Sequence, residues 1–177
     1  FEDGTYLQYS MIYHRLVVQL LTWFIQFSDF HQRKIDPKVI VKAKKSSRFI
    51  NCCIDEKTGH LPNYGHNDGS LLFPLSNCDY LDFRPSLQAL QSLISEQDIF
   101  VQNACLEEMA WIGKRSSLRI NKSVGKLEYG LFDFPSSGYC VIRELTTRTF
   151  LRYGSYQHRP AQADHLHVDL WHDGQAI

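Results

Sequence analysis

Residues 6–30 read YLQYSMIYHRLVVQLLTWFIQFSDF, and this stretch carries the strongest structural pattern of the chain. On a helix of about 3.6 residues per turn, its apolar side chains occur almost all round the axis. A helix of that kind is enclosed by other helices and does not lie on a surface. Asp3-Gly4-Thr5 stands just before it and is a suitable helix cap. The stretch therefore predicts a long helix inside a helical part of the chain.

Three further stretches have the spacing of apolar residues that favours helices, and they cover residues 37–53, 86–94 and 99–112. Pro37 and Pro85 stand where the first turns of two of these helices would begin, a position that suits proline. Long, turn-rich segments connect the stretches. We therefore expect antiparallel helical hairpins over residues 6–112, without any strand.

The composition changes after the last of these helices. Polar residues crowd residues 114–126, and β-branched and aromatic residues follow at 139–145 and 149–153. Helices first and strands afterwards indicate segregated α and β parts. The sequence therefore predicts an α+β chain, with a helical domain at residues 1–120 and an antiparallel β domain at residues 121–177.

The last strand signal alternates along the chain. Leu166, Val168 and Leu170 are separated by polar residues, so we expect these three side chains to enter the core. Asp173-Gly174 is a hairpin turn signal, and only three residues follow it. Because the chain also opens without an initiator Met, we expect a fragment that stops inside the β domain, with under-packed strands.

The composition excludes several classes of protein. The 177 residues are 44% hydrophobic, which is too apolar for a disordered chain, and 19 basic residues balance 19 acidic ones. Because basic residues do not form a long run, the sequence predicts no nucleic-acid partner. The apolar runs are interrupted before the roughly 20 residues that a bilayer span needs. The five cysteines are scattered without a C-x-x-C pair, so they read as reduced, buried side chains.

The first candidate for chemistry is Tyr13-His14-Arg15. Three consecutive residues on a helix point about 100° apart, so at most two of them share one pocket. A phenol beside a cation exchanges a proton with a substrate, which makes Tyr13 a candidate for proton transfer. The alternative is that Tyr13 is a packed tyrosine whose hydroxyl bonds a neighbouring helix.

The second candidate is the loop at residues 62–69. Two glycines bracket His66, Asn67 and Asp68, and they permit a tight backbone path that projects three polar side chains. Such loops form binding sites when a rigid scaffold holds them. The alternative is a turn in which the Asn and Asp side chains bond their own backbone.

Two more candidates lie near the end of the chain. His165, His167 and Asp169 would share one face of a strand, where two histidines could hold Zn²⁺, or the face would simply be solvated. Just before them, Arg159 is a forked donor suited to a carboxylate or sulfate, with an ordinary surface ion pair as its alternative.

The order of these segments resembles the heparinase II/III family, and the resemblance covers nearly the whole chain. It rests on Asp-Gly-Thr-Tyr-x-x-x-Ser-x-x-Tyr-His-Arg, then Asn-Tyr-Gly-x-Asn-Asp-Gly followed by Asp-x-Arg-Pro, then Gly-x-x-x-x-Arg-Pro-Ala-Gln-Ala-Asp-x-Leu-His-Val-Asp-Leu-Trp. The chain looks most similar to the branch encoded beside bacterial exopolysaccharide genes. The resemblance implies an incomplete α/α toroid followed by an antiparallel β-sandwich, in the bacterial periplasm or cytoplasm.

The family implies a polysaccharide lyase that acts on uronic-acid glycans such as heparan sulfate or alginate, without a cofactor. Such an enzyme neutralises the uronate carboxylate, removes the C5 proton with a base and protonates the departing oxygen with an acid. The resemblance maps the catalytic Tyr onto Tyr13, and His14 is the second catalytic candidate. The acidic polysaccharide would contact Arg15, Tyr64, His66, Asn67, Asp68, Arg84, Arg159, Gln162 and Asp164.

The sequence departs from the family pattern in two places. The carboxylate-neutralising Asn of the family would precede Phe1, and Pro160 and Gln162 stand at the two usual histidine positions before Asp164. Gln cannot take a proton at neutral pH, so we expect no tightly bound metal and no catalytic base at this position. The alternative is a non-catalytic glycan-binding or exopolysaccharide-assembly module. A helical-repeat interaction scaffold is a third, less favoured hypothesis, because a cleft lined by Tyr, Asn and Arg is not what a scaffold needs.

Overall fold

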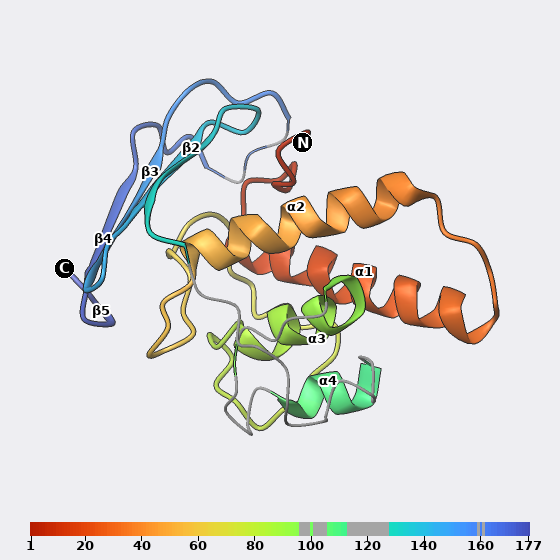
Figure 1. Ribbon diagram of the computed structural model, residues 1–177. Helices are drawn as coiled ribbons and strands as arrows, with labels where there is room; N and C mark the ends of the chain where they lie inside the picture. Colours follow the sequence, from red (N-terminus) through yellow and green to blue (C-terminus); the bar gives the residue numbers. More distant parts are fainter. Residues whose placement is uncertain (96–99, 101–105, 113–127, 159, 161) are drawn as a thin grey trace.

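A computed structural model describes residues 1–95, 100, 106–112, 128–158, 160 and 162–177. The described part is a mixed α+β structure (Figure 1). Its helices are α1 (Met11–Phe30), α2 (Pro37–Cys53), α3 (Arg84–Ile94) and α4 (Glu107–Ile112). Its strands are β1 (Gly130–Phe134), β2 (Tyr139–Arg143), β3 (Thr147–Arg152), β4 (Val168–His172) and β5 (Gln175–Ala176).

Side-chain caps fix where the two long helices begin. The Ser10 hydroxyl accepts a hydrogen bond from the Tyr13 N–H at 3.2 Å, so α1 begins at Met11, five residues later than its apolar pattern. Asp36 caps α2 in the same way, through the Lys38 N–H at 2.9 Å. The two helices form an antiparallel hairpin whose connection lies far from the sheet (Figure 1).

The predicted absence of strands before residue 112 holds for the described residues of that span. The third predicted helix begins at Arg84, two residues before the expected start. The fourth is described only from Glu107 onward, because residues 101–105 of that prediction lie outside the described residues. No helix in the described part of the chain is long and apolar enough to cross a membrane.

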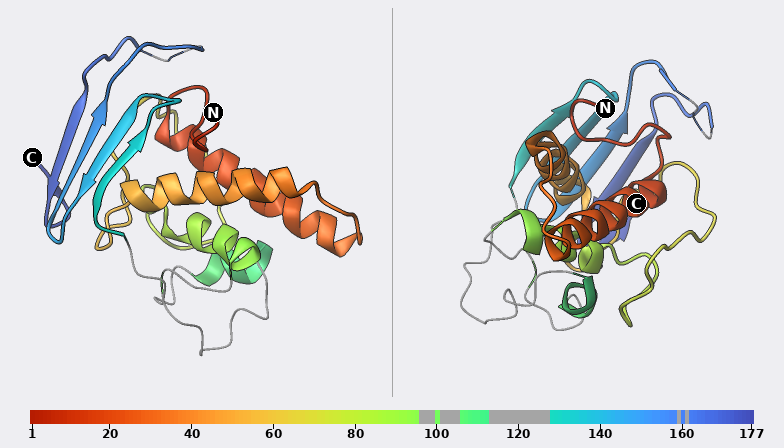
Figure 2. Two further views of the ribbon diagram at one scale, coloured as in Figure 1. Left: turned by 45° about the horizontal axis from the view of Figure 1, so that its top comes forward. Right: turned by 90° about the vertical axis from the view of Figure 1, so that its right-hand side faces the viewer.

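The five strands form one antiparallel sheet in the order β1-β2-β3-β4-β5. Two of them match the predicted strand stretches, and β1 was not predicted. The sheet stands at one end of the helices, and the C-terminal end of α2 meets it (Figure 2). The short strand β5 returns after Asp173-Gly174, so the predicted hairpin turn is present.

The last strand buries the opposite set of side chains from the set that the sequence predicted. Strand β4 begins only at Val168, because Leu166 adopts a positive φ of 58° and breaks the extended conformation before it. Trp171, at 8% exposure, takes the inner face, whereas Leu166, Val168 and Leu170 are 72%, 59% and 39% exposed. The prediction that these three residues enter the core was therefore wrong, because the bulkiest side chain of the strand fills the inner position.

The outer face of the sheet carries apolar side chains in one cross-strand row. Leu131 pairs with Ile142, Ile142 with Thr149, and Thr149 with Leu170. Leu131, Ile142 and Leu170 are all exposed. The sheet therefore has one face against the helices and one apolar face in solvent.

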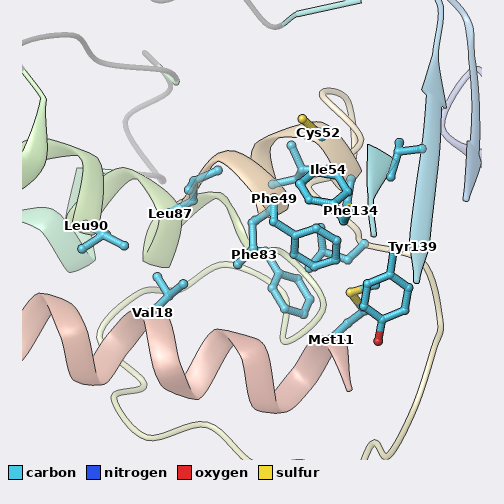
Figure 3. Close-up of a cluster of buried hydrophobic side chains, with 14 of the residues drawn as sticks. Met11, Val18, Phe49, Cys52, Ile54, Phe83, Leu87, Leu90, Phe134 and Tyr139 are labelled. Carbon is cyan, nitrogen blue, oxygen red and sulfur yellow. The ribbon is translucent and has the colours of Figure 1, made fainter. Parts of the chain in front are cut away.

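Helices and sheet share one hydrophobic core (Figure 3). Phe49 of α2 is at its centre, with its ring edge-on to Phe134 at 4.9 Å and stacked on Tyr139 at 5.5 Å. Val18 of α1 and Leu87 of α3 are fully buried in the same core. This continuous packing fixes α1 relative to the sheet and positions the site described next.

Candidate functional site

The loop at residues 62–69 is seated on the N-terminal end of α1. The Ser10 hydroxyl donates to the His66 carbonyl at 2.6 Å, and the Met11 N–H donates to the Tyr64 carbonyl at 3.1 Å. Gly65 lies between them at a φ of 81°, and a side chain there would overlap the backbone just before α1. Only glycine fits this approach, so the sequence places the polar tip of the loop above the first turn of the helix.

Three predicted site residues come together at this point, and we call Tyr13, His66 and Asp68 the tyrosine cluster. The Tyr13 hydroxyl donates to a carboxylate oxygen of Asp68 at 2.9 Å, and the Tyr13 ring lies 6.2 Å from the His66 ring. Hydrogen bonds from Ser70 and from Tyr13 lower the pKa of the Asp68 carboxyl. The His66 and Asp68 side chains are exposed, so a large ligand can reach the cluster.

Asn67 lies beside the cluster with its amide orientation fixed. Its side-chain oxygen accepts a hydrogen bond from the Tyr80 hydroxyl at 2.9 Å and another from the Gly69 N–H at 3.3 Å. Because the oxygen already has two donors, the exposed NH₂ group is the part of Asn67 that faces a ligand.

His14 lies elsewhere, in the core. Its Nε2 is 2.7 Å from the Ser46 hydroxyl, and its ring stacks on Phe49 at 5.1 Å. Burial lowers the pKa of His14 to about 3, so the imidazole stays neutral at physiological pH. The structure does not bring His14 together with the tyrosine cluster.

Arg15 is also buried and is held by internal partners. Its guanidinium donates to the carbonyls of Tyr80 and Ser70 and lies 4.5 Å from the centres of the Tyr80 and Phe83 rings. Burial lowers the pKa of Arg15. The residue ties the loop that follows Asp68 to α1 and does not project toward a ligand.

Arg84 has a similar internal role at the start of α3. It forms an ion pair with Asp82 at 2.7 Å and donates to the carbonyls of Glu56 and Lys57 at 3.1 and 3.2 Å. The forked side chain thereby joins two turns of the chain. Two of the three arginines expected to bind a glycan, Arg15 and Arg84, are therefore used inside the fold.

Three other predicted site residues, Tyr64, Gln162 and Asp164, lie close to one another. The buried Tyr64 hydroxyl is 2.9 Å from the Tyr156 hydroxyl, and burial together with this hydrogen bond raises the pKa of Tyr64. The exposed Gln162 amide is 3.5 Å from a carboxylate oxygen of Asp164. Arg159 lies outside the described residues.

Asp164 has an unpredicted partner, His167. Its carboxylate is 2.7 Å from His167 Nδ1, and the His167 ring lies 5.0 Å from the Tyr64 ring. The spacing Asp-x-x-His could have indicated this pair. The predicted strand over residues 165–169 made such a local contact unexpected. Because β4 starts only at Val168, both residues lie in the turn before the strand.

The expected strand face of His165, His167 and Asp169 does not form. The three side chains have separate partners: His165 is 3.2 Å from the Gly154 carbonyl, and Asp169 accepts from the Trp171 indole. Among the described residues, no group of three or more His, Cys, Asp or Glu side chains is arranged to hold a metal ion.

No family model, curated protein or solved structure matches this chain.

Proposed function

We propose that the protein is a polysaccharide lyase that cleaves uronic-acid-containing chains by β-elimination at the tyrosine cluster. The observation that carries this proposal is the Tyr13–Asp68 hydrogen bond, formed at an exposed point beside the His66 imidazole. In this proposal the helices belong to an incomplete α/α toroid and the sheet is one layer of a β-sandwich, as the sequence resemblance implies.

The acid of the reaction is Tyr13. The Asp68 carboxylate accepts the phenolic proton in a hydrogen bond and thereby keeps that proton on the tyrosine before substrate binds. A phenol held in this way donates to the glycosidic oxygen as the C4–O bond breaks. Because the cluster is exposed, solvent can return the proton to Tyr13 after each turnover.

The base of the reaction is His66. Imidazole is the side chain that accepts a proton near neutral pH. His66 would take the C5 proton, the electron pair of the C–H bond would form the C4=C5 double bond, and the leaving oxygen would carry away the C4–O electrons. One proton leaves the sugar and one reaches the leaving group, so the step is balanced.

Asn67 would bind the carboxylate of the uronate. The amide NH₂ group of Asn67 is turned outward by the two donors on its oxygen. A hydrogen bond to the uronate carboxylate stabilises the negative charge that develops when the C5 proton is lost. His14 and Arg15 are outside this scheme because both are buried.

A second candidate function is a glycan-binding module without turnover. The internal use of Arg15 and Arg84 favours it, because neither guanidinium is free to neutralise a uronate. Such a module would retain the loop and its polar side chains while lacking the charge stabilisation that a lyase needs.

One assay separates the two functions. The chain is incubated with a panel of uronate polysaccharides, and ultraviolet absorbance detects the unsaturated uronate that β-elimination produces. A rise in absorbance that Tyr13→Phe abolishes supports the lyase. Binding of a uronate polymer without any rise in absorbance supports the binding module. If the chain shows no turnover and no binding, both proposed functions are refuted.

A further inference from the structure

A small pocket of about 70 Å³ lies where the inner face of the sheet meets the turn after α2. Two arginines line it, Arg143 of β2 and Arg148 of β3. They stand directly opposite each other on neighbouring strands, and their exposures are only 5% and 4%. Like charges in this position repel each other, and burial strengthens the repulsion. The two guanidinium groups therefore need negative charge nearby.

Arg143 has that negative charge within the protein. Its Nη2 is 3.2 Å from a carboxylate oxygen of Glu56, and its Nη1 donates to the Asn51 carbonyl at 2.8 Å. A guanidinium with a carboxylate and a carbonyl has the partners that a buried cation requires.

Arg148 has no such partner. Its one described hydrogen bond runs from Nη1 to the His60 carbonyl at 3.4 Å, and the group otherwise lies over the Trp171 ring at 4.9 Å. Its Nε and Nη2 atoms are buried without an acceptor among the described residues. No described carboxylate is within ion-pairing distance of it, although Asp55 and Asp169 are in its vicinity.

We infer that the pocket binds a small oxyanion of the phosphate or sulfate class, with Arg148 as its principal ligand. A guanidinium presents parallel N–H groups that match two oxygens of such an ion. A water molecule would satisfy one N–H group, whereas an oxyanion satisfies two and pairs directly with the buried charge. The pocket has room for several waters, and therefore for one small oxyanion in their place.

The size of the pocket favours a small ion over a charged glycan. Four carboxylates also line it, and each already accepts a hydrogen bond from a neighbour: Asp55 from Thr58, Glu56 from Arg143, Glu144 from Thr147 and Asp173 from Lys57. A pocket of about 70 Å³ has room for one small oxyanion but not for a sugar unit of a uronate polymer. The oxyanion site is therefore distinct from the tyrosine cluster, and its ligand does not depend on the proposed lyase activity.

The test is thermal unfolding of the whole chain in inorganic phosphate and in sulfate, each compared with chloride at the same ionic strength. We expect saturating oxyanion to raise the wild-type Tm by about 5 °C, because an ion that binds only the folded state stabilises it. Arg148→Met should lose this response. In chloride alone, the same variant should unfold at the wild-type temperature or above it, because a buried charge without an ion-pair partner has been removed.

The matched control is Arg152, a second buried arginine on the same face of β3. Its guanidinium already donates to the carbonyls of Gly138 and Ser155 and stacks on Tyr156. Arg152→Met should lower the Tm in chloride and keep the response to oxyanion. If Arg148→Met does not fold, Arg148→Lys replaces it, and its response should be weaker than that of wild type because the fork is lost.

Three results would overturn the inference. The first is a wild-type Tm that rises equally in chloride and in oxyanion. That result means that salt only screens the charges of the protein and that no specific ion binds. The second is an Arg148→Met or Arg148→Lys variant with the full wild-type response, which places the ion elsewhere. The third is a strongly lowered Tm of an Arg148 variant in chloride together with a wild-type Tm that does not respond to oxyanion. That result means that water molecules satisfy the hydrogen bonds of Arg148. A response to phosphate and not to sulfate, or the reverse, keeps the site and identifies its preferred ion.

Discussion

At the scale of single residues, neighbours in the sequence have opposite environments. Tyr13 presents its hydroxyl to Asp68 at the surface, whereas the next residue, His14, is buried against Phe49. Their directions around α1 differ by about 100°, which is enough to separate surface from core. The exposed imidazole of the site is instead His66, which the loop contributes.

The first prediction concerns the phenol of Tyr13. Tyr13→Phe removes only the hydroxyl, and we expect turnover of a uronate polymer to fall by roughly a hundredfold or more, the usual size of a lost general acid. The thermal stability should change little because the Asp68 partner is exposed. Turnover is measured by the appearance of unsaturated uronate.

The control for that variant is Tyr153→Phe. Tyr153 also donates its hydroxyl to an exposed aspartate, Asp133, but the pair lies on the sheet. Its loss should leave turnover unchanged. Near-normal turnover in Tyr13→Phe would show that Tyr13 is a structural tyrosine and that the chemistry lies elsewhere.

The second prediction concerns Glu108, which is buried between α1 and α3. Its carboxyl accepts from Gln19 at 3.2 Å and from Ser86 at 3.0 Å, yet burial raises its pKa to about 7. A raised pKa means that the folded state holds a proton which the unfolded state has lost. The stability that this carboxyl contributes is therefore full below about pH 4.5 and is lost as the pH rises to about 7.

We expect Glu108→Gln to remove this pH dependence, which amounts to at most about 3 kcal/mol, and to be more stable than wild type at pH 8. Denaturant unfolding at pH 5 and pH 8 measures the difference. Glu107→Gln is the control, because Glu107 lies nearer the surface and accepts from the Asn77 N–H. An unchanged pH slope in Glu108→Gln would contradict the assignment.

At the scale of elements, the loop and the first helix act as one unit. The 62–73 segment follows the first half of α1: His66 contacts Ser10, Asp68 contacts Tyr13, Ser70 contacts Arg15 and Phe73 contacts Gln19. These contacts, two to four residues apart along α1, hold the irregular segment against the helix. This explains how a loop rich in Gly and Asn positions side chains for chemistry.

The third prediction tests the docking of the loop. Gly65→Ala introduces a side chain at positive φ and into the backbone before α1, so it should lower the free energy of unfolding by about 2 kcal/mol or more. Gly69→Ala has nearly the same φ but nothing near its Cβ, so it should cost only about 1 kcal/mol. Chemical denaturation compares the two, and equal effects would mean that the close approach of Gly65 is unimportant.

At the scale of the whole molecule, the sheet has one face in the core and one apolar face in solvent. Val141 is fully buried against the helices, whereas its neighbour Ile142 is 44% exposed in the row that also contains Leu131 and Leu170. Exposed apolar rows of this kind promote association between sheets. We therefore expect the isolated chain to self-associate as its concentration rises.

The fourth prediction follows from that row. Ile142→Lys with Leu170→Lys should reduce self-association, measured by light scattering, while the Tm stays within a few degrees because both side chains are exposed. Val141→Lys is the contrasting variant, since it buries a charge and should prevent folding. Unchanged scattering in the double variant would exclude this face as the site of association.

The sequence alone determined the features that depend on local chemistry. The first helix, predicted over residues 6–30 and five residues shorter in the structure, the helix at residues 37–53, the absence of strands in the described residues before 112, and two of the strands follow from apolar spacing. These signals act between residues that are close in the sequence, so they can be recognised without knowledge of the tertiary structure. The loop with His66, Asn67 and Asp68 could be predicted for the same reason, because two glycines bracket it.

Only the tertiary structure decided which face of each element is buried. Periodicity relates the faces of an element to each other but does not say which one meets the core, because that depends on residues distant in the chain. For this reason His14 and Arg15 proved internal, and the phase of β4 was the reverse of the prediction. The pairing of Asp164 with His167 and the lack of a described partner for the Arg148 charge likewise arise only when distant segments pack together.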